Sequence, residues 1–246
     1  MVCMCVMRLA SLYSGGKDST FSLYIMEQMG HDVPYLVNVM PEDKASWIFH
    51  TPNLSVVPVM AEAMGKELVT APSTGTEEGD MEGLRKALEG LDVDGVITGA
   101  VWSDYQWDRM NLVCNDLGLK VFSPLWRKDQ DLLMDAFLQS GIKAIIVGCY
   151  AEGLGQEWLG RVIDADAVKE LKEIRARYGI SIMGEGGEYE SMTLDSPMHS
   201  HPIEIVSSEI SWKKDNGTLN VTSARLGQRS GLESPHPQSV RYDGYR

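Results

Sequence analysis

Residues 14–19 read Ser-Gly-Gly-Lys-Asp-Ser, and they directly follow the apolar stretch Leu-Ala-Ser-Leu-Tyr at positions 9–13. The apolar stretch predicts a buried strand, and glycines just after a strand let backbone N–H groups approach a phosphate chain closely. The helix expected next offers its positive end to the same anion. This strand, loop and helix therefore predict an α/β fold that binds a nucleotide.

The loop differs from the two commonest nucleotide-binding loops. A Walker loop has four residues between its first glycine and its Gly-Lys pair, then Ser or Thr, and no such string occurs. The dinucleotide fingerprint G-x-G-x-x-G also fails, because Gly15 and Gly16 are adjacent and no third glycine follows at that spacing. The hexapeptide instead resembles the PP-loop of the N-type ATP pyrophosphatases. That resemblance implies cleavage of ATP between its α and β phosphates and adenylation of an acceptor.

Short apolar runs alternate with helical patterns in the first half of the chain, which is typical of βαβ units and a parallel sheet. We expect strands at 9–13, 34–39, 67–70, 93–101 and 120–122, with helices at 19–29, 53–64, 81–88 and 104–117 between them. Residues 1–125 are therefore predicted to form a Rossmann-like, doubly wound parallel sheet of the PP-loop ATPase (HUP) type. Ligands of such sheets bind at the carboxyl ends of the strands. The loop at Ser14 should thus meet the strand ends at Val39 and Met40 and at Gly99 and Ala100.

The second half of the chain has a different pattern. Helices are expected over 129–140 and after a cap at Asp164 or Asp166, with an apolar strand over 144–147. Alternating runs at 203–212 and 219–224 are joined through Asn216-Gly217, a strong hairpin signal. Residues 126–226 are therefore predicted to form a smaller, acceptor-binding α+β domain. The polar composition of 227–246 predicts a disordered tail.

Charge and composition limit the function classes. The chain has 246 residues, with 22 basic and 35 acidic side chains and a net charge of −13. This balance disfavours a stable nucleic-acid partner, because nucleic-acid binding usually needs a basic surface. The four cysteines form no C-x-x-C pair, and no apolar run approaches the length of a membrane span. We expect a cytoplasmic protein without a membrane partner, and the hairpin leaves a homo-oligomer open.

The PP-loop carries the first candidate site. Donors to phosphate oxygens are expected from its backbone and hydroxyl groups, at Ser14, Gly15, Gly16, Asp18, Ser19 and Thr20. Lys17 adds a mobile positive charge. Asp18 has two interpretations: a magnesium ligand, directly or through water, or the N-cap of the helix.

An acidic string forms the second candidate site: Glu185, Gly186, Gly187, Glu188, Tyr189 and Glu190. Its three carboxylates repel one another and its paired glycines forgo packing, so stability alone does not explain it. If Gly187 is extended, Glu188 and Glu190 face the same side, which suits a metal or an incoming ammonium ion. The alternative is a solvated acidic turn.

Three weaker candidates lie in loops and at a helix start. Tyr105 and Arg109 share a face after the fourth strand. Either they contact the nucleotide, or Arg109 forms a surface ion pair with an aspartate. His50 follows the second strand and is a candidate contact to nucleotide or acceptor, although a lone loop histidine is more often a bystander. Glu152 and Gly153 are candidates for lining the acceptor cleft.

Five strings together, at 14–19, 49–53, 99–109, 152–160 and 184–190, resemble the diphthine–ammonia ligase family, in its archaeal single-module form. The resemblance covers about residues 7–205. It implies that ATP and ammonium convert diphthine on translation elongation factor 2 into its amide, releasing AMP and pyrophosphate. It also implies ATP and Mg²⁺ as cofactors. Lys17 and Asp18 would then act on the phosphates, and Glu188 and Glu190 on the ammonium.

Two other functions fit the PP-loop. One is a PP-loop enzyme that modifies tRNA, although such proteins often carry C-x-x-C pairs and basic surfaces. The other is a regulatory module that binds adenine nucleotides without turnover, and this leaves the acidic string unexplained.

Overall fold

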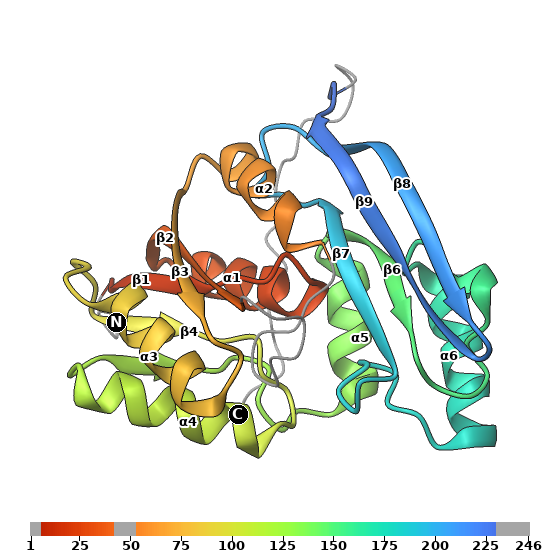
Figure 1. Ribbon diagram of the computed structural model, residues 1–246, viewed down its shortest axis with the longest axis horizontal. Coiled ribbons are helices and arrows are strands. Elements are labelled where there is room, and N and C mark those ends of the chain that lie inside the picture. The colour runs from red at the N-terminus through yellow and green to blue at the C-terminus, as the bar shows by residue number, and fades with distance from the viewer. Residues whose placement is uncertain (1–5, 42–52, 230–246) are drawn as a thin grey trace, which may run out of the picture.

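The structure is a computed structural model that describes residues 6–41 and 53–229 (Figure 1). The first half contains β1 (Arg8–Leu12), α1 (Lys17–Gln28), β2 (Asp32–Pro41), a 3₁₀ turn η1 (Leu54–Val56), α2 (Val57–Met64), β3 (Glu67–Ser73), α3 (Glu77–Leu88), β4 (Gly95–Ile97), α4 (Asp104–Asp116) and β5 (Lys120–Phe122). The second half contains α5 (Gln130–Gln139), β6 (Lys143–Cys149), a 3₁₀ turn η2 (Gln156–Trp158), α6 (Ala165–Tyr178), β7 (Tyr189–Asp195), β8 (Ile203–Lys213) and β9 (Asn216–Leu226).

The first sheet is parallel throughout, with strand order β3-β2-β1-β4-β5. One face packs on α3 and α4, through buried side chains such as Leu84 and Val113. The other face packs on α1 and α2, through side chains such as Phe21 and Met60. Helices on both faces of a parallel sheet are the doubly wound arrangement, so the predicted fold class of the first half is confirmed.

The second sheet is antiparallel, with strand order β7-β6-β9-β8. Its apolar side chains join those of α1 and α2 in one core, where the rings of Phe21 and Phe137 meet edge to face at 6.0 Å. The second half is thus α+β, and in Figure 1 β7 runs beside α1. None of the helices within the described ranges has the length and apolar character needed to cross a bilayer.

Several element boundaries differ from the sequence-based expectation. The predicted hairpin is present, but its turn lies at Lys214 and Asp215, where Lys214 adopts a positive φ of 54°. Asn216 and Gly217 belong to β9 instead, where they pair with Lys213 and Trp212 of β8. The glycine fits there because a Cβ at position 217 would lie only 2.5 Å from the Trp212 ring. Helix α3 starts four residues early, since the Thr76 side chain caps it by accepting from the Gly79 N–H.

Other differences concern strands. The run at 93–101 yields only the three-residue β4, because the chain then turns to pack Gly99 on the start of α1. Strand β7 was not predicted at all. Of the expected tail, residues 230–246 lie outside the described residues. Arg229 is ordered, and its guanidinium donates to Asp195 at 2.9 Å.

Candidate functional site

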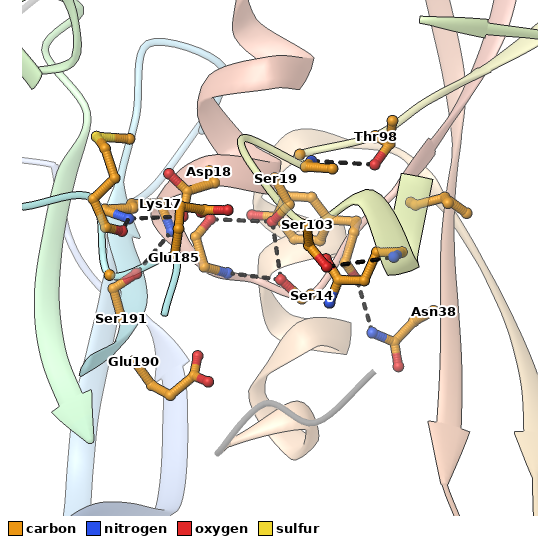
Figure 2. A pocket seen from close by; sticks show the side chains of 18 of the residues that line it. Ser14, Lys17, Asp18, Ser19, Asn38, Thr98, Ser103, Glu185, Glu190 and Ser191 are labelled. Carbon is orange, nitrogen blue, oxygen red and sulfur yellow. Dashed lines mark hydrogen bonds and ion pairs between the residues drawn. The ribbon is translucent and has the colours of Figure 1, made fainter. Parts of the chain in front are cut away.

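A cavity of about 560 Å³ opens at the carboxyl ends of β1, β2 and β4. Segment 183–191, from the second half of the chain, closes its opposite side (Figure 2). It is lined by residues of the PP-loop, the strand ends and the acidic string, including Ser14, Gly16, Lys17, Asp18, Ser19, Val39, Gly99, Ala100, Glu185, Gly187, Tyr189 and Glu190. The PP-loop and the strand ends at Val39, Gly99 and Ala100 thus converge on one site, as the topology predicts, and the acidic string joins them there.

The conformation of the PP-loop depends on its two glycines. Gly15 has a φ of +82°, a conformation that favours glycine, and a Cβ there would collide with the Met60 sulfur at 2.8 Å. Gly16 is the N-cap of α1, so the N–H groups of the first turn lie beside the cavity, and that of Lys17 donates to Ser191 Oγ at 3.1 Å. The Ser14 and Ser19 hydroxyls lie 3.2 Å apart beside them. These donors form a cradle for an anion.

Two predicted loop residues lie behind the cradle. The Thr20 hydroxyl donates to Gly16 O at 2.9 Å and contacts the hydroxyls of Tyr13 at 3.0 Å and Thr193 at 2.9 Å. The Gly15 carbonyl accepts from the Thr193 N–H at 2.8 Å. Thr20 and Gly15 therefore shape the loop, and neither lines the cavity.

Lys17 is buried, with a side chain 2% exposed. Its Nζ donates to Asp18 Oδ2 at 2.7 Å and to the Met183 carbonyl, and it lies 5.2 Å from the centre of the Tyr189 ring. Burial disfavours the charged form, but Asp18, Tyr189 and Glu185 outweigh it and raise the pKa of Lys17 above its ordinary value. Lys17 thus stays charged at neutral pH.

Asp18 is no N-cap, because α1 starts at Lys17 and Gly16 caps it. Its Oδ2 pairs with Lys17, whereas its Oδ1 is buried and has no hydrogen-bond partner among the described residues. An unpaired carboxylate oxygen beside a phosphate cradle fits Mg²⁺, which binds through one or two carboxylates plus phosphates. Among residues 6–41 and 53–229, no three Asp, Glu, His or Cys side chains are placed so that they could hold one metal ion together. The nucleotide would have to supply the remaining ligands.

Glu185 and Glu190 bring two more carboxylates to the cavity. Burial, and next the charge of Asp18, raise the pKa of Glu185 to about 7, although its Oε2 accepts from the Trp102 N–H at 3.2 Å. Burial also raises the pKa of Glu190 to about 7, against the attraction of Lys17. Three carboxylates thus share the cavity with one lysine, an arrangement that attracts a cation.

Glu188 does not share this site with Glu190, so the expected pairing is wrong. Gly187 adopts a φ of +79° and is not extended, which turns the Glu188 side chain away. Its carboxylate accepts from the Ser181 N–H and the Gly186 N–H, each at 2.7 Å, and fastens the turn. Glu188 and Gly186 line a second groove, which borders the cavity and is described below.

Several other candidates lie outside the cavity. Arg109 forms an ion pair with Glu77 at 2.7 Å, and its guanidinium lies 3.3 Å from the centre of the Tyr105 ring. Of the two alternatives for Arg109, nucleotide contact or a surface ion pair, the structure has the ion pair. Met40 is exposed at the end of β2. Glu152 and Gly153 are exposed in the loop after β6. None of these five lines the cavity, and His50 lies outside the described residues.

The cavity also includes polar residues that the sequence did not single out: Asn38, Thr98, Ser103, Gln106 and Ser191. Asn38 donates to the Tyr13 carbonyl at 2.7 Å and so braces the strand before the loop. Thr98 and Ser103 follow β4, where the topology already placed the site. Ser191 lies on β7, and no local sequence signal indicated it.

A second groove of about 670 Å³ borders the cavity and shares Ser103 and Glu185 with it. Trp102, 47% exposed, lies in its wall, with Asp129, Glu188 and Arg175 farther along. A molecule bound in this groove would reach the carboxylates of the cavity from the outside.

The fold and the loop define an α/β nucleotide-binding protein of the PP-loop type. Residues 7–121 match the diphthamide synthase N-terminal domain, and residues 129–226 match the diphthamide synthase C-terminal domain. The chain therefore belongs to the diphthamide synthase, or diphthine–ammonia ligase, family. As a member of it, the chain is an ATP-dependent ligase.

The curated relatives carry the same name. The diphthine–ammonia ligase of Danio rerio is 37% identical over 225 residues, covering 82% of this chain and 88% of the relative. Those of Bos taurus and Homo sapiens are each 34% identical over 227 residues, covering 83% of this chain and 85% of each relative. The crystal structure of a predicted subunit of tRNA methyltransferase from Methanocaldococcus jannaschii aligns with 77% of this chain and 98% of its own chain. The TM-score of this alignment is 0.44 and the sequence identity is 13%.

Proposed function

We propose that the chain amidates diphthine on translation elongation factor 2 with ammonium, through an acyl-adenylate, and releases AMP and pyrophosphate. The observation that carries this proposal is that one cavity holds Lys17 and Asp18 of the PP-loop together with Glu185 and Glu190. The pKa of each of these two glutamates is raised to about 7. The first pair suits phosphate chemistry. The second pair suits a cationic nitrogen donor.

The first step activates the acceptor. A carboxylate oxygen of the acceptor attacks the α-phosphorus, a P–O bond forms, and the bond from the α-phosphorus to the bridging oxygen breaks. Charge builds on the departing pyrophosphate, where Lys17 and the N–H groups at the start of α1 stabilise it. Because the pKa of Lys17 is raised, its charge is present throughout the physiological pH range. Mg²⁺ bound through Asp18 would neutralise phosphate charge.

The second step transfers nitrogen. Glu190 and Glu185 attract ammonium electrostatically, and the ion gives up a proton to one of them. A carboxylate whose pKa is about 7 accepts a proton more readily than an ordinary glutamate does. Ammonia then attacks the acyl carbon and the C–O bond to AMP breaks, while the attacking nitrogen loses a second proton, to the departing AMP or to the other glutamate, to leave the amide.

The acceptor would enter through the second groove. This groove reaches the cavity at Ser103 and Glu185 and leaves the side near Val39, at the end of β2, to the nucleoside. The exposed Trp102 ring offers a contact for the incoming segment.

The experiment incubates the protein with ATP, Mg²⁺, ammonium and the diphthine-bearing factor, and measures AMP, pyrophosphate and amide. Equal amounts of the three products, each dependent on the factor, support the proposal. Pyrophosphate release without the factor, or no release with it, overturns the ligase reaction on this acceptor. A factor lacking diphthine serves as the control for the acceptor.

A further inference from the structure

Strand β7 crosses from the second half of the chain to the phosphate cradle of the first. The Thr193 N–H donates to the Gly15 carbonyl at 2.8 Å, and the Ser191 Oγ accepts from the Lys17 N–H at 3.1 Å. Ser191 and Thr193 are two positions apart, so both side chains face the PP-loop. Figure 2 shows Ser191 beside Lys17 at the wall of the cavity.

Ser191 is only 5% exposed, yet it lines the cavity. A Cβ built on Gly16 would lie 3.7 Å from its Oγ, so the hydroxyl lies next to the Gly16–Lys17 peptide. That peptide provides the first N–H of α1, where a helix binds anionic phosphate oxygens.

A serine hydroxyl has one hydrogen to donate and two lone pairs. One lone pair of Ser191 is used by the Lys17 N–H, whereas its own hydrogen has no acceptor within the described parts of the chain. A buried O–H without an acceptor is costly, and such groups in proteins are rarely left unpaired. The free donor next to the cradle therefore points to a ligand oxygen.

We propose that Ser191 donates its hydroxyl hydrogen to the β- or γ-phosphate of ATP. The second half of the chain then supplies a direct phosphate ligand, which the Thr193 contacts hold against the PP-loop. This inference rests on the ATP site of the proposed function, and it is independent of the acceptor and of the amidation step.

A purely structural role for Ser191 makes a different prediction. If its hydroxyl only braces the Lys17 N–H, removing it disturbs the loop for every adenine nucleotide. A bond to the β- or γ-phosphate is instead felt by ATP and not by AMP. The ratio of the two affinities separates the roles.

The test measures, by calorimetry, the binding of AMP and of α,β-methylene-ATP, an analogue that cannot be cleaved between the α and β phosphates. We expect S191A to weaken the analogue about tenfold or more, as for a lost hydrogen bond to a charged group, with AMP affinity changed less than about twofold. S191T keeps the hydroxyl and should retain most of the affinity. S22A is the matched control, because Ser22 is a buried serine of α1 that does not line the cavity.

Equal weakening of both nucleotides, or of neither, overturns the proposal. S191C guards against misfolding of S191A, since it keeps the side-chain volume and weakens the donor. It should lose affinity for the analogue and keep affinity for AMP. A wild-type protein that binds neither nucleotide would instead refute the ATP site itself, so the two failures are distinguishable.

Discussion

Glu190→Gln tests the electrostatics of the cavity through the stability of the protein. Burial raises the pKa of Glu190 to about 7, from an ordinary value of 4.5. The folded state thus binds this proton more tightly than the unfolded state. The stability from it is fully present below about pH 4.5 and is lost as the pH rises to about 7. Glutamine mimics the protonated carboxyl and cannot lose it.

The size of the effect follows from the displaced pKa. If the whole pKa difference between the folded and unfolded states counts, E190Q raises the free energy of unfolding by about 3 kcal/mol at pH 8. Glu190 keeps part of its surface exposed, so solvent screening reduces the expected gain to about 1 to 2 kcal/mol. For a chain of this size that is a rise in Tm of about 3 to 6 °C.

The assay is thermal and urea unfolding of wild type and E190Q at pH 5 and pH 8. We expect E190Q to be more stable at pH 8 and nearly equal to wild type at pH 5. E209Q, on the exposed strand β8, is the matched control and should show no such pH-dependent gain. A stability difference that does not change with pH, or an E190Q protein that is less stable at pH 8, would exclude a raised pKa of Glu190 in the folded protein. The latter would mean that Lys17 stabilises the ionised form more than burial penalises it.

Three further substitutions separate the parts of the site. K17M should lower AMP formation by about 10² to 10³, the usual cost of a lost transition-state donor, and a steady-state assay of AMP checks this. E188A should lower stability by about 1 to 2 kcal/mol in urea unfolding, because two backbone N–H groups lose their acceptor, while ATP affinity stays unchanged. G99A places a Cβ 2.8 Å from the Ser19 N, so calorimetry should show ATP affinity reduced by about tenfold or more; unchanged affinity would mean that the strand end yields.

The first half of the site could be predicted because its signals are local. Gly15, Gly16 and Lys17 follow a strand and precede a helix, and the carboxyl ends of parallel strands meet at one edge. These two facts are enough to place the loop, Val39 and Gly99 together from the amino-acid sequence alone.

The part of the site that comes from the second half of the chain could be predicted less fully, because its geometry depends on contacts between residues distant in sequence. The positive φ of Gly187 separates Glu188 from Glu190, and nothing local in the sequence dictates it. The side chains of Ser191, Met192 and Thr193 are buried in succession along β7, so the strand lacks the alternation that indicates a half-buried strand. Ser191 was therefore missed. A surface ion pair of Arg109 was one of two alternatives, but its partner, Glu77, could not be named because it lies on another helix.

In the proposed reaction the acceptor carboxylate is adenylated in this cavity. The most direct test of this step uses diphthine-bearing factor labelled with ¹⁸O in the carboxylate, followed by mass spectrometry of the AMP formed with ATP and ammonium. Attack by the carboxylate on the α-phosphorus predicts one ¹⁸O in each AMP, matched by one amide. Unlabelled AMP, or label found in orthophosphate, would show that the acceptor carboxylate does not attack the α-phosphorus.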